Sequence, residues 1–460
     1  MHPTRWRRST HLGIGVSVVA LVVALVTAVA VFTSADHGSG GAQTMPSPPT
    51  AMARPEVVPV GDTAPMPTAG GLAAALSAVV ADPNLGRLGG RITDAITGKP
   101  LWTQQDNLPM QPASTNKVLT AAAALLALDR DARLTTRVMA GDQPGVVVLV
   151  GGGDPVLSAA PAGQDTWYRD AARVSDLADQ VRRSGVTPTA VQVDVSAFSG
   201  PTMAPGWDAM DIEGGDIAPI ESVMLDAGRI QPTTVESRRS LTPALDAGRA
   251  LATALGIDTK RVSITTAVVG GRELGSVQSA PLITRLGQMM NASDNVMAEC
   301  IGREVAAAMY RPRSFSGAVE AVTNRLATAH IEVSSAALVD SSGLSVEDRL
   351  TAHSLDAVVQ AAAGPDQPKL RPLLDMLPVA GGSGTLSDRF LDARPGQNAA
   401  GWLRAKTGSL TRTNALAGVV TDRDWRVLTF AFISNDAGPM GRTAIDTVAA
   451  TLRSCGCGGP

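Results

Sequence analysis

The sequence predicts a mixed α/β (α+β) protein in which an antiparallel sheet is flanked by helices and joined to an all-helical part. Three β-rich stretches follow one another near the C-terminus, at residues 402–410, 415–421 and 426–434. A helical stretch from about 441 to 453 follows them. Successive strands predict an antiparallel meander covered by helices. The Ala/Leu-rich run at 118–128 predicts a buried helix for the helical part.

A segment with a different pattern interrupts this arrangement. We interpret residues 138–280 as one or two small inserted mixed domains, because a buried strand is predicted at Val146–Val150 and further strand-like stretches lie at 190–198 and 262–269. Helical character resumes from Pro281. The main domain would then comprise residues 72–137 and 281–455. Helical spacing opens it at 72–80, and Thr97-Gly98-Lys99 lies between two short strand-like runs as a hairpin signal.

The composition excludes several classes of function. The 460 residues are 44% hydrophobic, so the chain can bury more than one core. A net charge of -3 and a pI near 6.0 give no electrostatic footprint for nucleic acid. The five histidines are scattered without metal-ligand spacing, so we predict no metal site and no cofactor.

The N-terminal residues predict export. Three arginines within the first eight residues precede an apolar run from Leu12 to Phe32, which is long enough for one membrane span of roughly 20 residues. Positive charge on this side predicts that the N-terminus stays in the cytoplasm. We expect residues 1–33 to form a cytoplasmic tip and a single membrane anchor. The alternative is a signal sequence cleaved near Ala28-Val29-Ala30, and in either case the body lies outside the cytoplasm, in the cell envelope.

Residues 34–71 are rich in Pro, Gly and Ala and predict an extended linker between the membrane and the folded body. The three cysteines, Cys300, Cys455 and Cys457, are too few for a disulfide scaffold. An oxidising compartment permits a bridge from Cys300 to one of the terminal pair. Three unpaired thiols are the alternative.

A Ser-x-x-Lys motif, Ser114 to Lys117, opens the Ala/Leu-rich helix. Pro112 and Ser114 are typical of a helix start, and residues i and i+3 share a helical face. We therefore expect Lys117 beside the Ser114 hydroxyl, on a helix too apolar for the surface. Burial disfavours the charged form of lysine, and a neutral amine can act as general base for a hydroxyl. Taken alone, the motif is a weak signal, and a capping serine with a solvated lysine is the more common interpretation of it.

Two further motifs follow in the chain: Ser293-Asp294-Asn295 on a predicted helical stretch and Lys406-Thr407-Gly408-Ser409 on a predicted strand. Separately, they fit a polar helix cap and a strand-end turn. Together with Ser114-x-x-Lys117, and in this order, they resemble the three-motif signature of the active-site serine penicillin-recognising enzymes. The resemblance implies the penicillin-binding/β-lactamase-like transpeptidase fold.

The same resemblance implies a role for each residue, because attack on an amide needs an activated hydroxyl, donors for the oxyanion and a proton for the leaving amine. The implied catalytic residues are Ser114 as nucleophile, Lys117 as base, Ser293 as proton relay, Asn295 as the amide that orients substrate, and Lys406 as positive charge. The implied substrate-binding residues are Thr407 for the substrate carboxylate, Gly408, which leaves room for substrate, and Ser409, whose backbone N–H would complete the oxyanion hole with that of Ser114.

Within this group the chain resembles the DacB-type, class C low-molecular-mass penicillin-binding proteins over about residues 72–453. The gap between Lys117 and Ser293 is far longer than in a compact serine β-lactamase, and this family fills it with inserted domains. The resemblance implies a serine D,D-peptidase that cleaves the terminal D-Ala-D-Ala bond of peptidoglycan stem peptides through an acyl-enzyme. D-Ala-diaminopimelate cross-links would be a second substrate, and β-lactams would be covalent inhibitors.

The resemblance also implies a specificity residue. In relatives an aspartate four positions after a Pro-Gly-Trp tryptophan contacts the free amine of diaminopimelate, and here Asp211 takes this position after Trp207. A loop aspartate that caps a turn is the alternative interpretation. Relatives often carry a basic residue directly after a Ser-Gly-Leu-Ser segment, whereas this chain has Val346 there and Arg349 three positions later.

Two alternative functions differ from the D,D-peptidase in features of the sequence. A serine β-lactamase deacylates with the glutamate of a Glu-x-x-Leu-Asn loop between the first two motifs, and this chain has no such loop. A non-catalytic penicillin-binding wall scaffold would be expected to lose a catalytic residue, and all of them are present.

Overall fold

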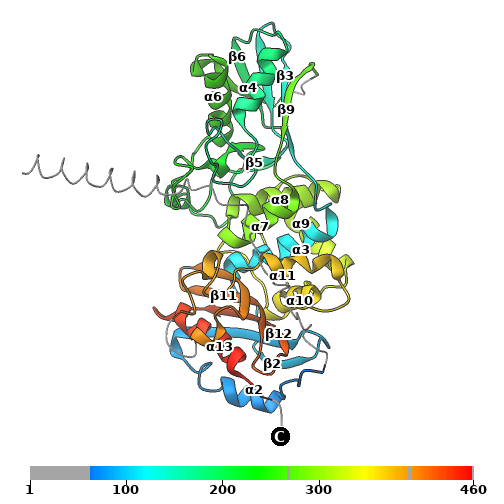
Figure 1. Cartoon of the computed structure of the whole chain (residues 1–460), viewed down its shortest axis with the longest axis vertical. Coiled ribbons are helices and arrows are strands. Elements are labelled where there is room, and N and C mark those ends of the chain that lie inside the picture. The colour runs from blue at the N-terminus through cyan, green and yellow to red at the C-terminus, as the bar shows by residue number, and fades with distance from the viewer. Residues whose placement is uncertain (1–62, 267–269, 392–395, 458–460) are drawn as a thin grey trace, which may run out of the picture. The chain divides into compact units, whose positions relative to one another are not determined.

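The computed structural model describes residues 63–266, 270–391 and 396–457 (Figure 1). They all belong to one compact unit, Pro59–Pro460. The predicted membrane anchor at 1–33 lies outside the described residues, as does most of the predicted linker. Among the residues that are described, no helix is both long and apolar enough to cross a membrane.

In this part of the chain, the predicted C-terminal meander belongs to a five-stranded antiparallel sheet with the order β10-β11-β12-β1-β2. Its strands are β10 (Leu403–Leu410), β11 (Thr413–Thr421), β12 (Val427–Asn435), β1 (Arg87–Asp94) and β2 (Pro100–Gln104). The three predicted strands and the hairpin at residues 97–99 are confirmed. The pairing of Arg87 with Asn435 joins them into one sheet.

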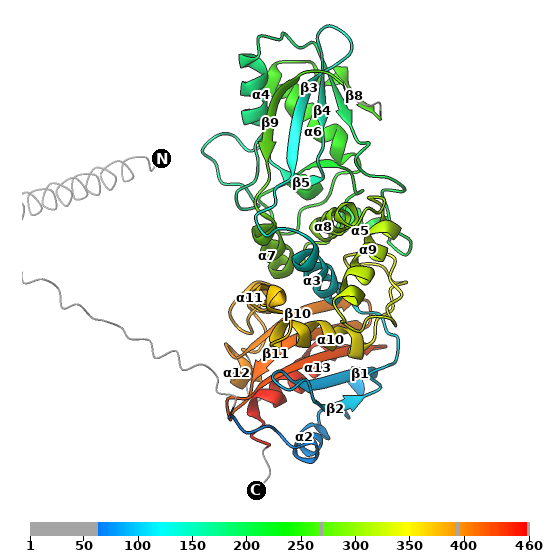
Figure 2. The same ribbon diagram turned by 90° about the vertical axis from the view of Figure 1, so that its right-hand side faces the viewer.

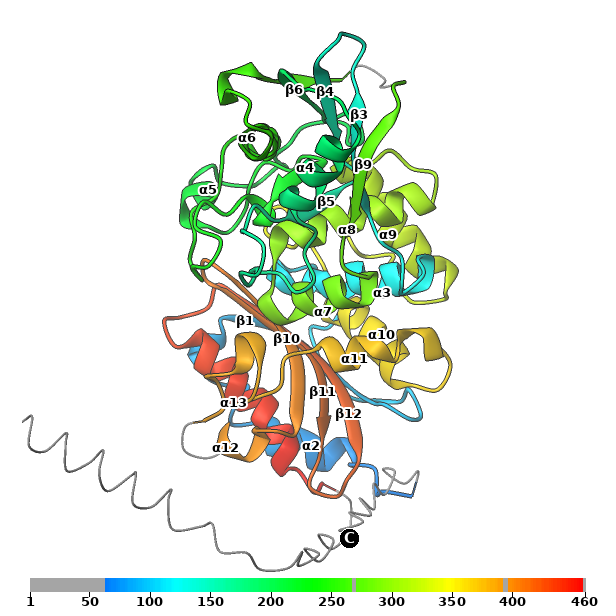
Figure 3. The same ribbon diagram turned by 45° about the horizontal axis from the view of Figure 1, so that its top comes forward.

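Helices cover both faces of this sheet, and both faces are therefore apolar. On one face Leu416, Phe430 and Phe432 pack with helices α2 and α13, while Ala417 and Ala431 on the other face belong to the core of the helical part. Figure 3 shows the strands between α13 on one side and α10 with α11 on the other. The helices of the first face are α2 (Ala69–Leu76), α12 (Gly396–Ala399) and α13 (Gly441–Ser454).

The all-helical part is built around the Ala/Leu-rich helix α3 (Lys117–Ala127), whose residues from Lys117 to Leu126 are all buried. A helix that is apolar on all sides is stable only when other elements surround it. Its neighbours α8, α9 and α10 pack against it, as Figure 2 shows. The helices of this part are α7 (Leu282–Ala292), α8 (Asn295–Ala308), α9 (Phe315–Thr328), α10 (Ala352–Ala363) and α11 (Pro372–Met376).

Between α3 and α7 the chain forms a second five-stranded sheet with the order β8-β6-β4-β3-β9, which is mixed parallel and antiparallel. Its members, with the helices packed on them, are β3 (Thr135–Ala140), β4 (Val146–Val150), β6 (Ala190–Asp194), β8 (Val262–Thr265), β9 (Glu273–Gln278), α4 (Val174–Arg183) and α6 (Pro243–Leu255). A parallel pair, β5 (Asp154–Leu157) with β7 (Val223–Leu225), and the short helix α5 (Met210–Gly214) complete this region. The division of the chain at residues 138 and 280 stays a prediction.

The cysteines differ from both alternatives that the sequence left open. Cys455 and Cys457 form a disulfide with each other, and Cys300 is a free, buried thiol on α8. The bridge closes within three residues just after α13, and Cys455 packs in the same core as that helix. Cys300 acts as a small apolar side chain of the helical core, because it is 1% exposed.

Some element boundaries also differ from the predictions. The helix predicted at 72–80 begins at Ala69 and ends at Leu76. It begins there because Thr68 caps its N-terminus by accepting a hydrogen bond from the Gly71 N–H. The strands predicted at 190–198 and 262–269 end at Asp194 and Thr265, with residues 267–269 outside the described chain.

Candidate active site

Ser114 lies in a tight turn rather than in the first turn of an α-helix. The turn is the 3₁₀ segment η2 (Ala113–Asn116), and α3 begins only at Lys117. Ala113 adopts φ +49°, a conformation that non-glycine residues rarely take. A local hydrogen bond also stabilises the turn: the Thr115 hydroxyl donates to the Pro112 carbonyl oxygen at 2.6 Å. The Ser114 side chain is half-buried at the surface of this turn.

Lys117 is in contact with Ser114, as the i to i+3 spacing predicts. Its Nζ lies 2.9 Å from Ser114 Oγ, 2.5 Å from Asn295 Oδ1 and 2.7 Å from the Ser342 carbonyl oxygen. The predicted burial is confirmed, because the Lys117 side chain has no exposed surface. Burial lowers the pKa of Lys117 to about 8, against the opposing attraction of nearby carboxyl groups, of which Asp340 is the strongest.

Ser293-Asp294-Asn295 forms the junction between α7 and α8, not part of a continuous helix as predicted. Ser293 ends α7 in the left-handed conformation at φ +59°, and Asp294 caps α8 by accepting from the Met297 N–H at 2.9 Å. The other Asp294 oxygen accepts a 2.5 Å hydrogen bond from the Tyr168 hydroxyl. At this break the Ser293 hydroxyl and the Asn295 amide each contact one of the two buried lysines.

Lys406 lies on β10, in contact with the junction between α7 and α8. Its Nζ donates to Ser293 Oγ and to the Thr407 carbonyl oxygen, both at 2.8 Å. Burial, and then the neighbouring charge of Lys117, hold the pKa of Lys406 well below its ordinary value. Thr407 donates a 2.8 Å hydrogen bond from its hydroxyl to Thr385 Oγ1, in the turn η6 (Gly384–Leu386).

Gly408 allows the Ser114 turn to approach β10. A Cβ at this position would lie 2.7 Å from the Pro112 carbonyl oxygen and 3.1 Å from the Ala113 Cβ. A larger residue would push the turn away from the strand. Gly408 therefore serves the contact between the first and third motifs, whereas the sequence assigned it to substrate access.

The two remaining predicted residues are Ser409 and Asp211. Ser409 is exposed on β10 and pairs with Asn414 of β11. Asp211 lies on α5 and is half-buried, with its pKa raised by burial and then by the charge of Asp216. The Asp216 carbonyl oxygen accepts a 3.0 Å hydrogen bond from Asn295 Nδ2. The structure thus brings together Ser114, Lys117, Ser293, Asn295, Lys406 and Thr407. Asp211 is connected to them through Asp216, whose backbone N–H donates to the Asp211 carbonyl oxygen at 2.9 Å.

The sequence profile of the D-Ala-D-Ala carboxypeptidase 3 (S13) family matches residues 72–238 and 232–452. This range includes all three motifs. The chain belongs to this family. Membership confirms the predicted enzyme class, a serine-type D-Ala-D-Ala carboxypeptidase. Residues 1–59 match a second profile, the N-terminal domain of Rv3627c-like carboxypeptidases.

Relatives of this S13 carboxypeptidase extend over its full length. It is 67% identical to carboxypeptidase Rv3627c of Mycobacterium tuberculosis over 99% of this chain and 100% of the relative. It is also 67% identical to carboxypeptidase DacB of Mycolicibacterium smegmatis, with both chains fully covered. Among solved structures, penicillin-binding protein 4 (dacB) of Haemophilus influenzae matches 84% of this chain and 98% of its own, at 23% identity and a TM-score of 0.67. This structural match confirms the predicted penicillin-binding fold.

A polar turn to which the sequence analysis gave no role also belongs to the site of this S13 carboxypeptidase. The sequence singled out Asp340-Ser341-Ser342-Gly343-Leu344-Ser345 as a family-like segment, without a role. In the structure its Ser342 carbonyl accepts from Lys117 Nζ, and Gly343 at φ +80° passes so close to Ala113 that a Cβ would lie 1.9 Å from the carbonyl oxygen. Polar residues with a glycine between helices were the only signal of this turn.

Asp340 organises this turn by accepting four hydrogen bonds from N–H groups. The donors are Ser342 N at 3.0 Å, Gly343 N at 2.6 Å, Ser345 N at 2.8 Å and Trp207 Nε1 at 2.8 Å. A buried carboxylate with this many donors fixes the backbone around it. Asp340 therefore holds the Ser342 carbonyl against Lys117 and also supplies negative charge to the lysine.

Replacing Asp340 by Asn is expected to slow acylation by about tenfold or more, because an amide cannot accept on both sides and the Ser342 carbonyl shifts. The pH midpoint of acylation should also move down, since Asp340 raises the pKa of Lys117. Stopped-flow or gel measurement of the acylation rate with a fluorescent penicillin, between pH 5 and 10, tests both effects.

Asp422→Asn is the matched control. Asp422 is also a buried aspartate that accepts backbone hydrogen bonds, from the N–H groups of Asp424 and Arg426, and it is not among the carboxyl groups that act on Lys117. Its midpoint should stay close to that of the wild type. An unchanged midpoint in Asp340→Asn would show that Asp340 does not act on Lys117.

Proposed function

We propose that this carboxypeptidase hydrolyses the terminal D-Ala-D-Ala bond of peptidoglycan stem peptides through an ester to Ser114. Ser114 Oγ bonds to the carbonyl carbon between the two D-alanines, and its proton passes to Lys117. The C–N bond then breaks, and the leaving amine departs as D-alanine after taking a proton. A water molecule hydrolyses the ester and regenerates the serine.

The contact of Ser114 with a buried lysine is the observation that carries this proposal. Asn295 Oδ1 and the Ser342 carbonyl can only accept, so they occupy two hydrogens of the Lys117 amine. In the neutral amine the third position is a lone pair, which faces Ser114 Oγ at 2.9 Å. The arrangement thus favours a hydroxyl that donates to the lysine, as a general base requires.

A second lysine supports proton delivery to the leaving amine. Lys406 donates to the Ser293 hydroxyl at 2.8 Å, and Ser293 lies two positions before Asn295, which contacts Lys117. We assign Ser293 as the relay that protonates the leaving nitrogen, with Lys406 restoring its proton. Two buried ammonium groups side by side are unfavourable, and a proton held by only one of the lysines relieves this repulsion.

We assign substrate binding to hydroxyl, amide and backbone N–H groups around the two lysines. The hydroxyls of Thr407 and Thr385 would receive the terminal carboxylate, close to Lys406. The Asn295 amide would exchange its present acceptor, the Asp216 carbonyl, for a carbonyl of the substrate. The backbone N–H groups of Ser114 and Ser409 would hold the oxyanion. Asp211 would bind the free amine of diaminopimelate.

We further assign the enzyme to the outer side of the cytoplasmic membrane, anchored by residues 1–33 or released after their cleavage. The N-terminal arginines and the apolar run from Leu12 to Phe32 support this location. β-Lactams would acylate Ser114. A crystal structure of the Haemophilus influenzae penicillin-binding protein 4 holds a β-lactam and matches this chain with a TM-score of 0.62.

The test is the release of D-alanine. Purified enzyme incubated with a pentapeptide ending in D-Ala-D-Ala should produce the tetrapeptide and free D-alanine, measured by mass spectrometry. The same enzyme should turn over a chromogenic cephalosporin slowly, because no Glu-x-x-Leu-Asn loop is present to activate the deacylating water. Rapid cephalosporin turnover without D-alanine release would reverse the assignment in favour of a β-lactamase.

A further inference from the structure

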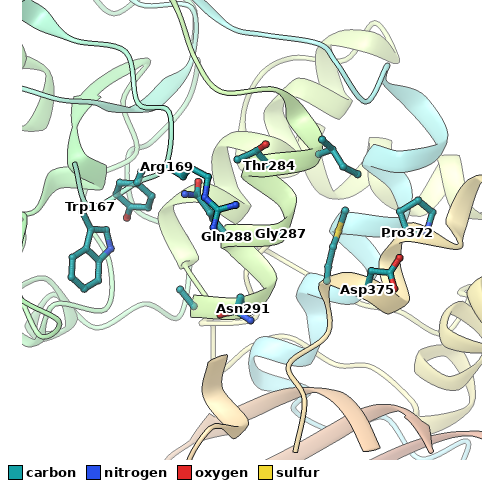
Figure 4. A pocket seen from close by; sticks show the side chains of 12 residues that line it. Trp167, Arg169, Thr284, Gly287, Gln288, Asn291, Pro372 and Asp375 are labelled. Carbon is teal, nitrogen blue, oxygen red and sulfur yellow. The ribbon is translucent and has the colours of Figure 1, made fainter. Parts of the chain in front are cut away.

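A groove of about 710 Å³ crosses the exposed face of α7 next to the Ser293 junction. Its floor is one face of the helix, formed by Thr284, Gly287, Gln288 and Asn291. Figure 4 shows its walls: Trp167 and Arg169 lie on one side of the helix, and Pro372 and Asp375 of α11 on the other. The Gly287 position is open, since an added Cβ would meet no atom within 4 Å.

Polar side chains without partners line this groove. Among the described residues, none of the following side chains has a hydrogen bond or an ion pair: Arg169, Thr284, Gln288, Asn291 and Asp375. Gln288 Oε1 is buried and still lacks a donor. Buried polar atoms in native proteins are nearly always satisfied. Of these five side chains, Gln288 supplies the buried atom without a partner, and an amide N–H of a ligand would satisfy it.

The groove begins where the proposed carboxylate site ends. Thr407 and Thr385 share a hydrogen bond, and Gly384 precedes Thr385 in η6. A Cβ on Gly384 would lie 2.5 Å from the Asn291 carbonyl oxygen, so η6 and α7 are in direct contact. Asn291 lines the groove and lies two positions before Ser293. A leaving residue whose carboxylate sits at Thr407 is therefore next to the groove entrance.

One wall of the groove is attached to the catalytic junction. Tyr168 lies between Trp167 and Arg169 in the chain, and its hydroxyl donates to Asp294 at 2.5 Å. The Arg229 guanidinium stacks on the Trp167 ring at 4.3 Å and holds the indole in place. The wall is thereby positioned relative to Ser293 and Asn295 before any substrate arrives.

We propose that this groove binds the second stem peptide of a cross-linked substrate, on the leaving-group side of the scissile bond. The inference rests on the proposed function. In a cross-link the leaving residue is a diaminopimelate, whose carboxylate beside the scissile amide replaces that of the terminal D-alanine. Its side chain is not a methyl group but a chain that continues into another peptide, which needs space beyond the carboxylate site.

The charges and amides of the groove match such a peptide. A stem peptide carries free carboxylates, which pair with Arg169. The side chains of Gln288 and Asn291 bind its backbone amides. The reaction balances as hydrolysis: Ser114 takes the acyl half, the diaminopimelate nitrogen takes a proton and leaves with the second peptide, and water releases the acyl half.

The experiment compares two substrates in the full-length enzyme. One is the linear pentapeptide ending in D-Ala-D-Ala, and the other is a dimer of tetrapeptides joined by a D-Ala-diaminopimelate bond. Gly287→Phe fills the groove, and we expect kcat/KM for the dimer to fall by about tenfold or more while the pentapeptide value stays within about twofold. Arg169→Glu, which repels carboxylates, should act in the same direction. Gly70→Phe is the matched control, because its Cβ also meets no atom within 4 Å and α2 lies on the far face of the catalytic sheet.

Each result decides one of the two proposals. Wild-type enzyme that cleaves the pentapeptide but not the dimer overturns the groove assignment and leaves the proposed function intact. Variants that cleave both substrates like the wild type also overturn it. If Gly287→Phe loses activity on both substrates, Arg169→Glu decides, and an equal effect on the two substrates refutes the groove. Wild-type enzyme that cleaves neither substrate and is not acylated by penicillin overturns the proposed function itself.

Discussion

Ser114→Ala should form no covalent adduct with penicillin and should lose D-alanine release by roughly 10⁴-fold or more, as happens when the nucleophile of a serine hydrolase is removed. The loss is chemical rather than structural. Ser114 is half-buried, and the turn around it is held by the Thr115 to Pro112 hydrogen bond and by contacts with β10. The variant should therefore fold and still bind the substrate.

Fluorescent penicillin followed by gel electrophoresis and intact-protein mass spectrometry measures the adduct. Ser77→Ala, a change to an exposed serine at the end of α2, is the matched control and should be labelled like the wild type. A Ser114→Ala protein that still carries one penicillin would place the nucleophile elsewhere, and peptide mapping would then locate it.

The second large effect concerns Lys117, which must be neutral when Ser114 attacks. Since burial lowers the pKa of Lys117 to about 8, the neutral fraction falls about tenfold for each pH unit below this value. The acylation rate at low inhibitor concentration should rise with pH up to about 8 and then level off. A lysine with its ordinary pKa of 10.5 would make the acylation rate level off more than two pH units higher.

Lys117→Met tests the same base by removal. Methionine fills a similar volume without an amine, and we expect acylation to fall by about 10³-fold or more and to lose its pH dependence around 8. Lys99→Met, on the exposed hairpin between β1 and β2, is the control for loss of a lysine. Thermal unfolding of each variant separates loss of the base from loss of the fold. Acylation by Lys117→Met at the wild-type rate would assign the base to another group.

Local rules in the sequence were sufficient for the first contact of the site. The spacing of Ser114 and Lys117 fixes their proximity within one turn, and the apolar run after them fixes the burial of the lysine. The three C-terminal strands, the first of which carries the third motif, follow from hydrophobic runs that end at polar turns. These features depend on neighbours in the chain, which is why a sequence pattern reveals them.

The other contacts depend on residues far apart in the chain. The sequence placed Ser293 within a helix, because nothing in its neighbours shows that it takes a left-handed conformation and ends α7. The Ser342 carbonyl reaches Lys117 across 225 positions, and Thr385 meets Thr407 across 22. A backbone carbonyl leaves no trace in residue type, so only tertiary structure identifies it as a partner.

The order of strands in the catalytic sheet has a consequence for how the enzyme is made. β1 is an inner strand of the sheet, between β2 and β12, and its residue Arg87 forms an ion pair with Asp436, 349 positions later. A ribosome has therefore completed Ser114 and the whole helical part long before β12 exists to pair with β1. Because long-range pairing is slow and waits for both strands, the sheet that carries the third motif is completed only after β12 has been made. A chain that stops before β12 would carry Ser114 and Lys117 but would lack the central strand that joins β11 to β1 in the catalytic sheet.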